Sequence, residues 1–315
     1  MFCQNKEKMV NLPVVGYGGT AASKQPSTPS FGTGSKCIED DALGPRMESQ
    51  GSNSEDLEGT KDPKRQSKLD GFWLLAVGGV QNPSYITKAN CSSMGITEIA
   101  QEDLEFFDRL QVLDLSDNNL SDERVLTHLC QLPQVTSLIL SCNKLQNIQD
   151  PVVYAQDPRN VFPNLRHLNL SFNELRCEVL EPLSRLYMLV SLDLSNNCIT
   201  SILKDRPREF LSLQELDLSC NDLVQFHQWA ALDMMPVLKR LNLSSNRIRH
   251  LTDDDESCQR TMFVNLTDFN LSNNEIALNL GGRSPNEFDD ETIAQALHNE
   301  LSQLQYFPNL EIVNL

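Results

Sequence analysis

LVSLDLSNNCI, residues 189–199, is the phrase that decides the fold of this chain. Its first, fourth and sixth places hold leucine, its ninth asparagine and its eleventh an aliphatic residue. A degenerate copy starts at Ile86, a cut-off copy starts at Leu310, and the starts lie 24 to 44 residues apart, so one unit repeats to the end of the chain. The clear further copies are LQVLDLSDNNL (110–120), VTSLILSCNKL (135–145), LRHLNLSFNEL (165–175), LQELDLSCNDL (213–223), LKRLNLSSNRI (238–248) and LTDFNLSNNEI (266–276).

The alternation inside each copy predicts a short strand. Apolar residues at the fourth and sixth places alternate with polar ones, so the strand points its leucines inward and its polar side chains toward a concave face. Successive strands then pair as one parallel sheet. The ninth-place asparagines are expected to form a column where each strand turns away, because an amide can satisfy backbone groups of its own and the neighbouring coil. They are Asn118, Asn143, Asn173, Asn197, Asn221, Asn246 and Asn274.

This pattern resembles the leucine-rich repeat family over residues 86–315. The resemblance implies an α/β solenoid with a curved parallel sheet on the concave face and helices and loops on the convex face. Val125, Leu126 and Leu129 suit a short convex helix. The apolar spacing from Ile293 to Leu304 suits another helix, which either packs on the solenoid or binds a partner helix.

Within that family, three stretches resemble the X-ray radiation resistance-associated proteins. They are Asn90–Ser92, Phe106–Leu120 and the insertion before FPNLEIVNL at residues 307–315. This resemblance implies an intracellular protein of cytoplasm and nucleus without a catalytic motif. The chain also resembles the leucine-rich repeat partner of type-one protein phosphatase, whose repeats are shorter and more regular.

Three regions are expected along the chain. Residues 1–70 are rich in Gly, Pro and Ser and lack apolar periodicity, which predicts a disordered tail. Residues 71–85 form an N-terminal cap, in which the apolar run Phe72–Val77 covers the first coil as a strand or hairpin. The repeats fill residues 86–315, and the last copy stops at its sixth place, so we expect the natural chain to continue beyond Leu315.

Composition excludes several functions. With 26 basic and 43 acidic residues and a net charge of -17, the chain does not suit nucleic-acid backbones. We find no run of about 20 apolar residues and no secretory signal, which predicts a chain that stays inside the cell and does not bind membranes. The nine cysteines include no Cys-x-x-Cys pair, so neither a metal site nor a disulfide framework is indicated. Gly16, Gly18 and Ala21 have the spacing of a dinucleotide-binding turn, but a Pro- and Ser-rich run follows, so no cofactor is predicted.

The outward strand positions hold the candidate binding residues. Asp193, Glu215 and Asp217 are expected to form an acidic strip. Charges of both signs on one face suit protein recognition, although an ordinary solvated surface has the same composition. Asp193 and Asp217 lie on neighbouring strands, but no nucleophile or base accompanies them, so no enzyme is predicted. The basic residues that border the strip are Arg166, His167, Lys239 and Arg240.

Two functional hypotheses follow. The first is a non-enzymatic scaffold that binds a protein partner on the concave face, with no small-molecule substrate. The second is a regulatory domain of a larger protein, or of a phosphatase-type enzyme complex, whose C-terminal part lies outside this sequence.

Overall fold

The computed structural model describes residues 67–153, 161–202, 210–224, 235–249, 264–276, 291, 292, 295, 298 and 309–314. The chain divides into two units, residues 14–66 and the remainder, and the described residues all belong to the second unit. Its elements are β1 (Ser67–Leu69), α1 (Gly71–Gly78), η1 (Pro83–Tyr85), β2 (Lys88–Asn90), β3 (Ile96–Ile99), η2 (Leu104–Phe106), β4 (Val112–Asp114), α2 (Val125–Leu129), β5 (Ser137–Ile139), β6 (His167–Asn169), η4 (Cys177–Val179), α3 (Leu180–Leu183), β7 (Ser191–Asp193), β8 (Glu215–Asp217), β9 (Arg240–Asn242), β10 (Asp268–Asn270) and β11 (Ile312–Asn314).

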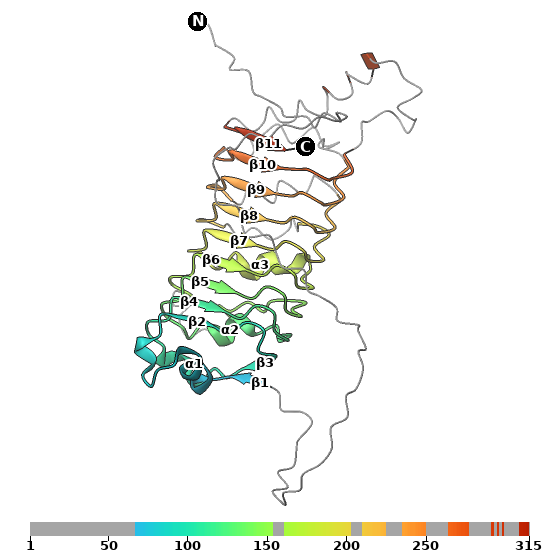
Figure 1. Ribbon diagram of the computed structural model, residues 1–315. Coiled ribbons are helices and arrows are strands. Elements are labelled where there is room, and N and C mark those ends of the chain that lie inside the picture. The colour runs from blue at the N-terminus through green and yellow to red at the C-terminus, as the bar shows by residue number, and fades with distance from the viewer. Residues whose placement is uncertain are drawn as a thin grey trace, which may run out of the picture. The chain divides into compact units, whose positions relative to one another are not determined.

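Nine strands form one parallel sheet in chain order, from β2 through β4 to β11 (Figure 1). The register pairs equal places of successive repeats, so that Leu192 of β7 lies opposite Leu168 of β6 and Leu216 of β8. Each strand spans the third to fifth places of its copy. The predicted parallel solenoid is therefore confirmed, and its strands lie where the alternation of leucine and polar residues places them.

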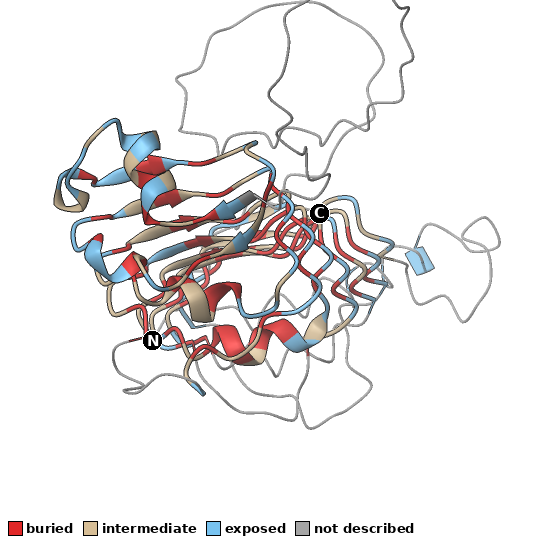
Figure 2. Ribbon diagram, turned by 90° about the horizontal axis from the view of Figure 1, so that it is seen from below, coloured by how far each residue is buried: buried red, intermediate tan, exposed pale blue. Residues whose placement is uncertain are grey.

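The repeat leucines fill a single core behind the sheet. Leu113, Leu138, Leu192 and their equivalents are buried, as are the residues at the first, sixth and eleventh places, except that Ile276 and Val313 near the C-terminal end are only partly buried. Figure 2 shows these buried positions along the inside of the stack, between the strands and the segments that return the chain. Each fully buried leucine contributes about 1.5 to 3 kcal/mol relative to an exposed one, so the repeated phrase is also the repeated source of stability.

Two short helices lie in the returning segments. Helix α2 spans Val125–Leu129, as its apolar spacing predicts, and α3 spans Leu180–Leu183. The apolar positions proposed for a helix between Ile293 and Leu304 lie outside the described residues. No helix in the described part of the chain is long and apolar enough to cross a membrane.

The N-terminal end differs from the expected strand or hairpin at Phe72–Val77. That run is helix α1, because Asp70 accepts a hydrogen bond from the Trp73 backbone N–H at 2.8 Å and Gly79 closes the helix in the left-handed conformation at φ 62°. The strand at this end is β1, which pairs with β3 and lies inside the range assigned to the tail. Leu69 and Leu74 are fully buried in the common core, so the described fold already starts at residue 67.

Candidate functional site

The ninth-place asparagines bind the backbone of two coils at once. The Asn143 amide nitrogen donates to the Leu140 carbonyl in its own coil, at 3.1 Å, and to the Leu115 carbonyl in the preceding coil, at 3.0 Å. Its oxygen accepts from the Leu120 N–H at 3.0 Å. The other six asparagines make the equivalent bonds. These side chains are fully engaged within the solenoid, and a partner cannot use them without breaking it.

The eighth place carries a backbone feature that the sequence analysis missed. Residues there adopt the left-handed conformation, with φ between 52° and 58°, although none of them is glycine. Asparagine and aspartate, which tolerate this region best, occupy three of these positions and were the available signal. The set is Ser93, Asp117, Cys142, Phe172, Asn196, Cys220, Ser245 and Asn273.

The fifth-place carboxylates are part of the turn that ends each strand. Asp193 accepts a hydrogen bond from the Ser195 N–H at 2.9 Å, and Asp217 accepts one from the Ser219 N–H at 2.8 Å. The second oxygen of Asp217 accepts from the Asn242 amide at 2.9 Å. Asp193 and Asp217 lie side by side in the sheet, and each carboxylate also holds the turn that ends its strand. Their role in partner binding stays a prediction.

The electrostatic surroundings of Asp193 oppose its ionisation. Burial of the carboxyl group raises its pKa above the ordinary aspartate value, and the neighbouring charge of Asp217 raises it further. Hydrogen bonds from Ser195 act in the opposite direction without cancelling the effect. The Asp193 carboxyl group is therefore less readily ionised than that of an exposed aspartate.

Glu215 is also engaged within the sheet. It forms an ion pair with Arg240 of the next strand and accepts a weak hydrogen bond from the Ser191 hydroxyl at 3.4 Å. Of the three residues of the predicted acidic strip, Glu215 has a cationic partner among the described residues, whereas Asp193 and Asp217 are held by hydrogen bonds alone. In the coils of β7 and β8 the second, third and fifth places are all partly exposed.

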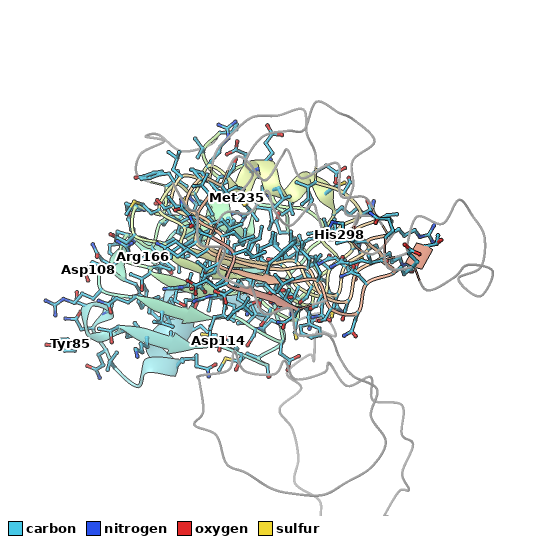
Figure 3. The ribbon with its side chains drawn as sticks, turned by 90° about the horizontal axis from the view of Figure 1, so that it is seen from above. Tyr85, Asp108, Asp114, Arg166, Met235 and His298 are labelled. Atoms are coloured by element: carbon cyan, nitrogen blue, oxygen red, sulfur yellow. The ribbon has the colours of Figure 1, made fainter. Side chains whose placement is uncertain are left out.

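The four basic candidates are all exposed on these second and third places. Arg166 and His167 lie in the coil of β6, and Lys239 and Arg240 lie in the coil of β9. Figure 3 shows Arg166 toward the same edge of the stack as Asp108 and Tyr85, where the chain approaches its strands, and Asp114 farther along the strand direction. Two basic pairs three strands apart are thus exposed, and Arg240 of the second pair is ion-paired with Glu215.

Two observations concern metal binding and cysteine chemistry in the described part of the chain. No group of three or more metal-ligating side chains gathers among them. Burial raises the pKa of the Cys91 thiol to about 11, which keeps that sulfur protonated and unreactive at neutral pH. Gly16, Gly18 and Ala21 lie outside the described residues.

Comparison with known proteins agrees with this architecture. The model of the Leucine Rich Repeat matches residues 109–132, 164–186 and 188–209, and a second Leucine Rich repeat model matches residues 211–224. The chain is a leucine-rich repeat protein. Domains of this kind generally mediate protein–protein interactions and are typically non-enzymatic.

Curated relatives of this leucine-rich repeat protein include tubulin chaperones. Tubulin-specific chaperone E of Xenopus laevis is 29% identical over 224 residues, which cover 64% of this chain and 42% of that protein. The Bos taurus protein of the same name is 34% identical over 173 residues, which cover 53% of this chain and 32% of that protein. The chain thus spans about a third to two fifths of the length of these relatives. The finer resemblance to X-ray radiation resistance-associated proteins stays a prediction.

Solved structures share the solenoid. Internalin C2 of Listeria monocytogenes is 25% identical with a TM-score of 0.52, covering 77% of this chain and 90% of that one. The LRIM1/APL1C complex contains a chain that is 20% identical with a TM-score of 0.51, covering 79% of this chain and 38% of that one. These likenesses support the fold of the leucine-rich repeat protein.

Proposed function

We propose that this chain is a non-enzymatic, intracellular scaffold that binds a protein partner on the strand face, the side predicted to be concave. The strand face is defined by the second, third and fifth places of the repeats. The observation that carries the proposal is the exposure of two basic pairs, Arg166 with His167 and Lys239 with Arg240, on a chain whose net charge is -17. Local charge opposite to that of the whole molecule favours one class of partner and one orientation of approach.

The rigidity of the strand face supports the same proposal. Its fifth-place Asn and Asp side chains are hydrogen-bonded to the turns, and its second- and third-place side chains project from strands held in register over nine coils. A partner therefore meets a preorganised surface, and little conformational entropy is lost from the scaffold on binding.

Tubulin is the first partner to test, because several relatives carry it in their names. Immobilised chain is incubated with purified tubulin, and the bound fraction is measured across a tubulin concentration series. The double variant Arg166→Glu/Lys239→Glu should weaken binding at least tenfold. The double variant Lys144→Glu/Arg176→Glu changes two exposed basic residues off the strand face and lowers the net charge by the same four units, so it is the matched control.

Equal loss in both double variants would mean that total charge, and not the strand face, governs binding. Absence of tubulin binding by the unsubstituted chain would remove tubulin as the partner. Circular dichroism of each variant checks that the solenoid is intact, since exposed charges contribute only about 0 to 1 kcal/mol to stability.

A further inference from the structure

The turns that precede the strands expose their tips. In several coils the N–H of the first-place leucine donates to the carbonyl three residues earlier, as from Leu189 to Leu186 at 2.9 Å and from Leu238 to Met235 at 3.1 Å. Leu186 and Met235 are themselves buried. The two residues between them and the first place form the tip of each turn and are exposed or half-buried, so the core constrains their identity less than that of the flanking residues. We call these the strand-start turns.

In four consecutive coils the first tip residue is apolar and exposed. Tyr187, Leu211 and Val264 are 37%, 55% and 53% exposed, and Pro236 is exposed as well. Their strands, β7 to β10, are neighbours in the sheet, at about 4.8 Å spacing, so the four side chains form a row of roughly 14 Å. The equivalent residue of the coil of β4 is the charged Asp108. The row Tyr187, Leu211, Pro236 and Val264 is named the start ridge.

Cations lie beside the start ridge. Lys239 and Arg240 follow Pro236 in the same coil, and Arg166 belongs to the coil adjoining that of Tyr187. Among the described residues, Arg240 forms its ion pair with Glu215, whereas Arg166 and Lys239 take part in none. An apolar row with two such cations about 14 Å apart is complementary to an apolar surface flanked by acids.

We propose that the start ridge binds an amphipathic helix of a partner protein, with its apolar stripe on the ridge and acidic residues toward Arg166 and Lys239. This inference rests on the proposed protein-binding function and narrows the partner. At 1.5 Å per residue the two acids would be about ten residues apart, with apolar residues at i, i+3, i+4 and i+7 between them. A helix fits better than an added strand, because the ridge offers side chains and a helix satisfies its own backbone.

The probe is a fluorescein-labelled synthetic helix of about 18 residues with a leucine stripe and two glutamates about ten residues apart. One control peptide replaces the glutamates with lysine, and another replaces the leucines with serine. Fluorescence anisotropy with the full chain should show binding of the acidic amphipathic peptide at least tenfold tighter than binding of either control peptide.

Two variants of the chain locate the site. Leu211→Ser/Val264→Ser should weaken binding of the acidic peptide at least tenfold. The matched control, Val153→Ser/Val224→Ser, changes two valines that are 63% and 39% exposed elsewhere and should leave binding unchanged. Lys239→Glu should weaken binding of the acidic peptide and strengthen binding of the lysine peptide.

Several outcomes would overturn the inference. Equal affinity of the chain for all three peptides, or no binding of any of them, would overturn it. A Leu211→Ser/Val264→Ser variant that binds the acidic peptide like the unsubstituted chain would also overturn it. Concentration-dependent dimerisation that this variant abolishes in sedimentation would show that a second copy covers the ridge. If tubulin binding depends on Arg166 and Lys239 but not on Leu211 and Val264, the proposed function is supported and the inference about the start ridge is wrong.

Discussion

All strands of the sheet start at one edge and end at the opposite edge, and these two edges obey different constraints. At the strand ends, the seven clear copies repeat almost the same residues, and the asparagine, the fifth-place side chain and the left-handed eighth residue all serve the backbone. At the strand starts, the chain turns with one backbone hydrogen bond and leaves its tip residues variable. The repeat keeps the same residues where buried polar groups must be satisfied, and its residues vary where side chains contact only solvent. We therefore look for partner recognition at the strand starts and at the outward places of the strands.

The largest expected difference between the edges concerns two leucines. Leu194 at a strand end is fully buried, whereas Leu211 in a strand-start turn is 55% exposed. Leu194→Ala should lower the free energy of unfolding by about 2 to 5 kcal/mol, through lost burial and a residual cavity. Leu211→Ala should change it by less than about 0.5 kcal/mol. Chemical denaturation of both variants tests the contrast, and equal losses would mean that the tips of the strand-start turns are packed.

A second comparison uses two asparagines. Asn197→Ala should cost about 1 to 3 kcal/mol, because it leaves the buried Leu175 N–H and Leu170 carbonyl without their partner. Asn164 in a strand-start turn makes one bond, to the Pro133 carbonyl at 3.0 Å, and its removal should cost less than about 1 kcal/mol. Thermal and denaturant unfolding give both values, and a larger loss at Asn164 would contradict the division between the edges.

The smallest change in the free energy of unfolding is expected at Asp193, where the sign of the change is informative. Its raised pKa means that the folded chain binds more protons than the unfolded chain between the ordinary aspartate pKa and the raised one, so stability falls as pH rises through that window. Asp193→Asn keeps the acceptor for the Ser195 N–H, as Asn169 does for Ser171 at 2.9 Å. The variant should therefore gain stability relative to the unsubstituted chain at pH 7, and less so near pH 4.

Denaturation at both pH values measures this difference. Asp193→Ala is the control, since it removes the charge and the hydrogen bond together and should be less stable than Asp193→Asn at either pH. A greater gain for Asp193→Asn in acid than at neutral pH would show that the carboxylate is stabilised by the fold, contrary to the direction of its pKa.

Much of the candidate site could be located from the sequence, but its roles could not. Spacing placed Asp193, Glu215 and Asp217 on neighbouring strands, as the register shows. Their hydrogen-bond and ion-pair partners could not be predicted, because the Ser195 N–H, Arg240 and Asn242 come close to these carboxylates only once the turns form and the coils stack. The start ridge was missed for the same reason, since Tyr187, Leu211, Pro236 and Val264 share no residue type and become a row only through the register of β7 to β10.

By itself the sequence determined the repeat, the places of its strands, their parallel order and the buried leucines, because a period of alternating apolar residues can bury its apolar face in only one register. The tertiary structure decided which polar groups are consumed by the fold and which face solvent. At the N-terminal end it also decided that Gly71–Gly78 is a helix, since a short, uniformly apolar run suits a strand or a buried helix equally and only its caps, Asp70 and Gly79, separate the two.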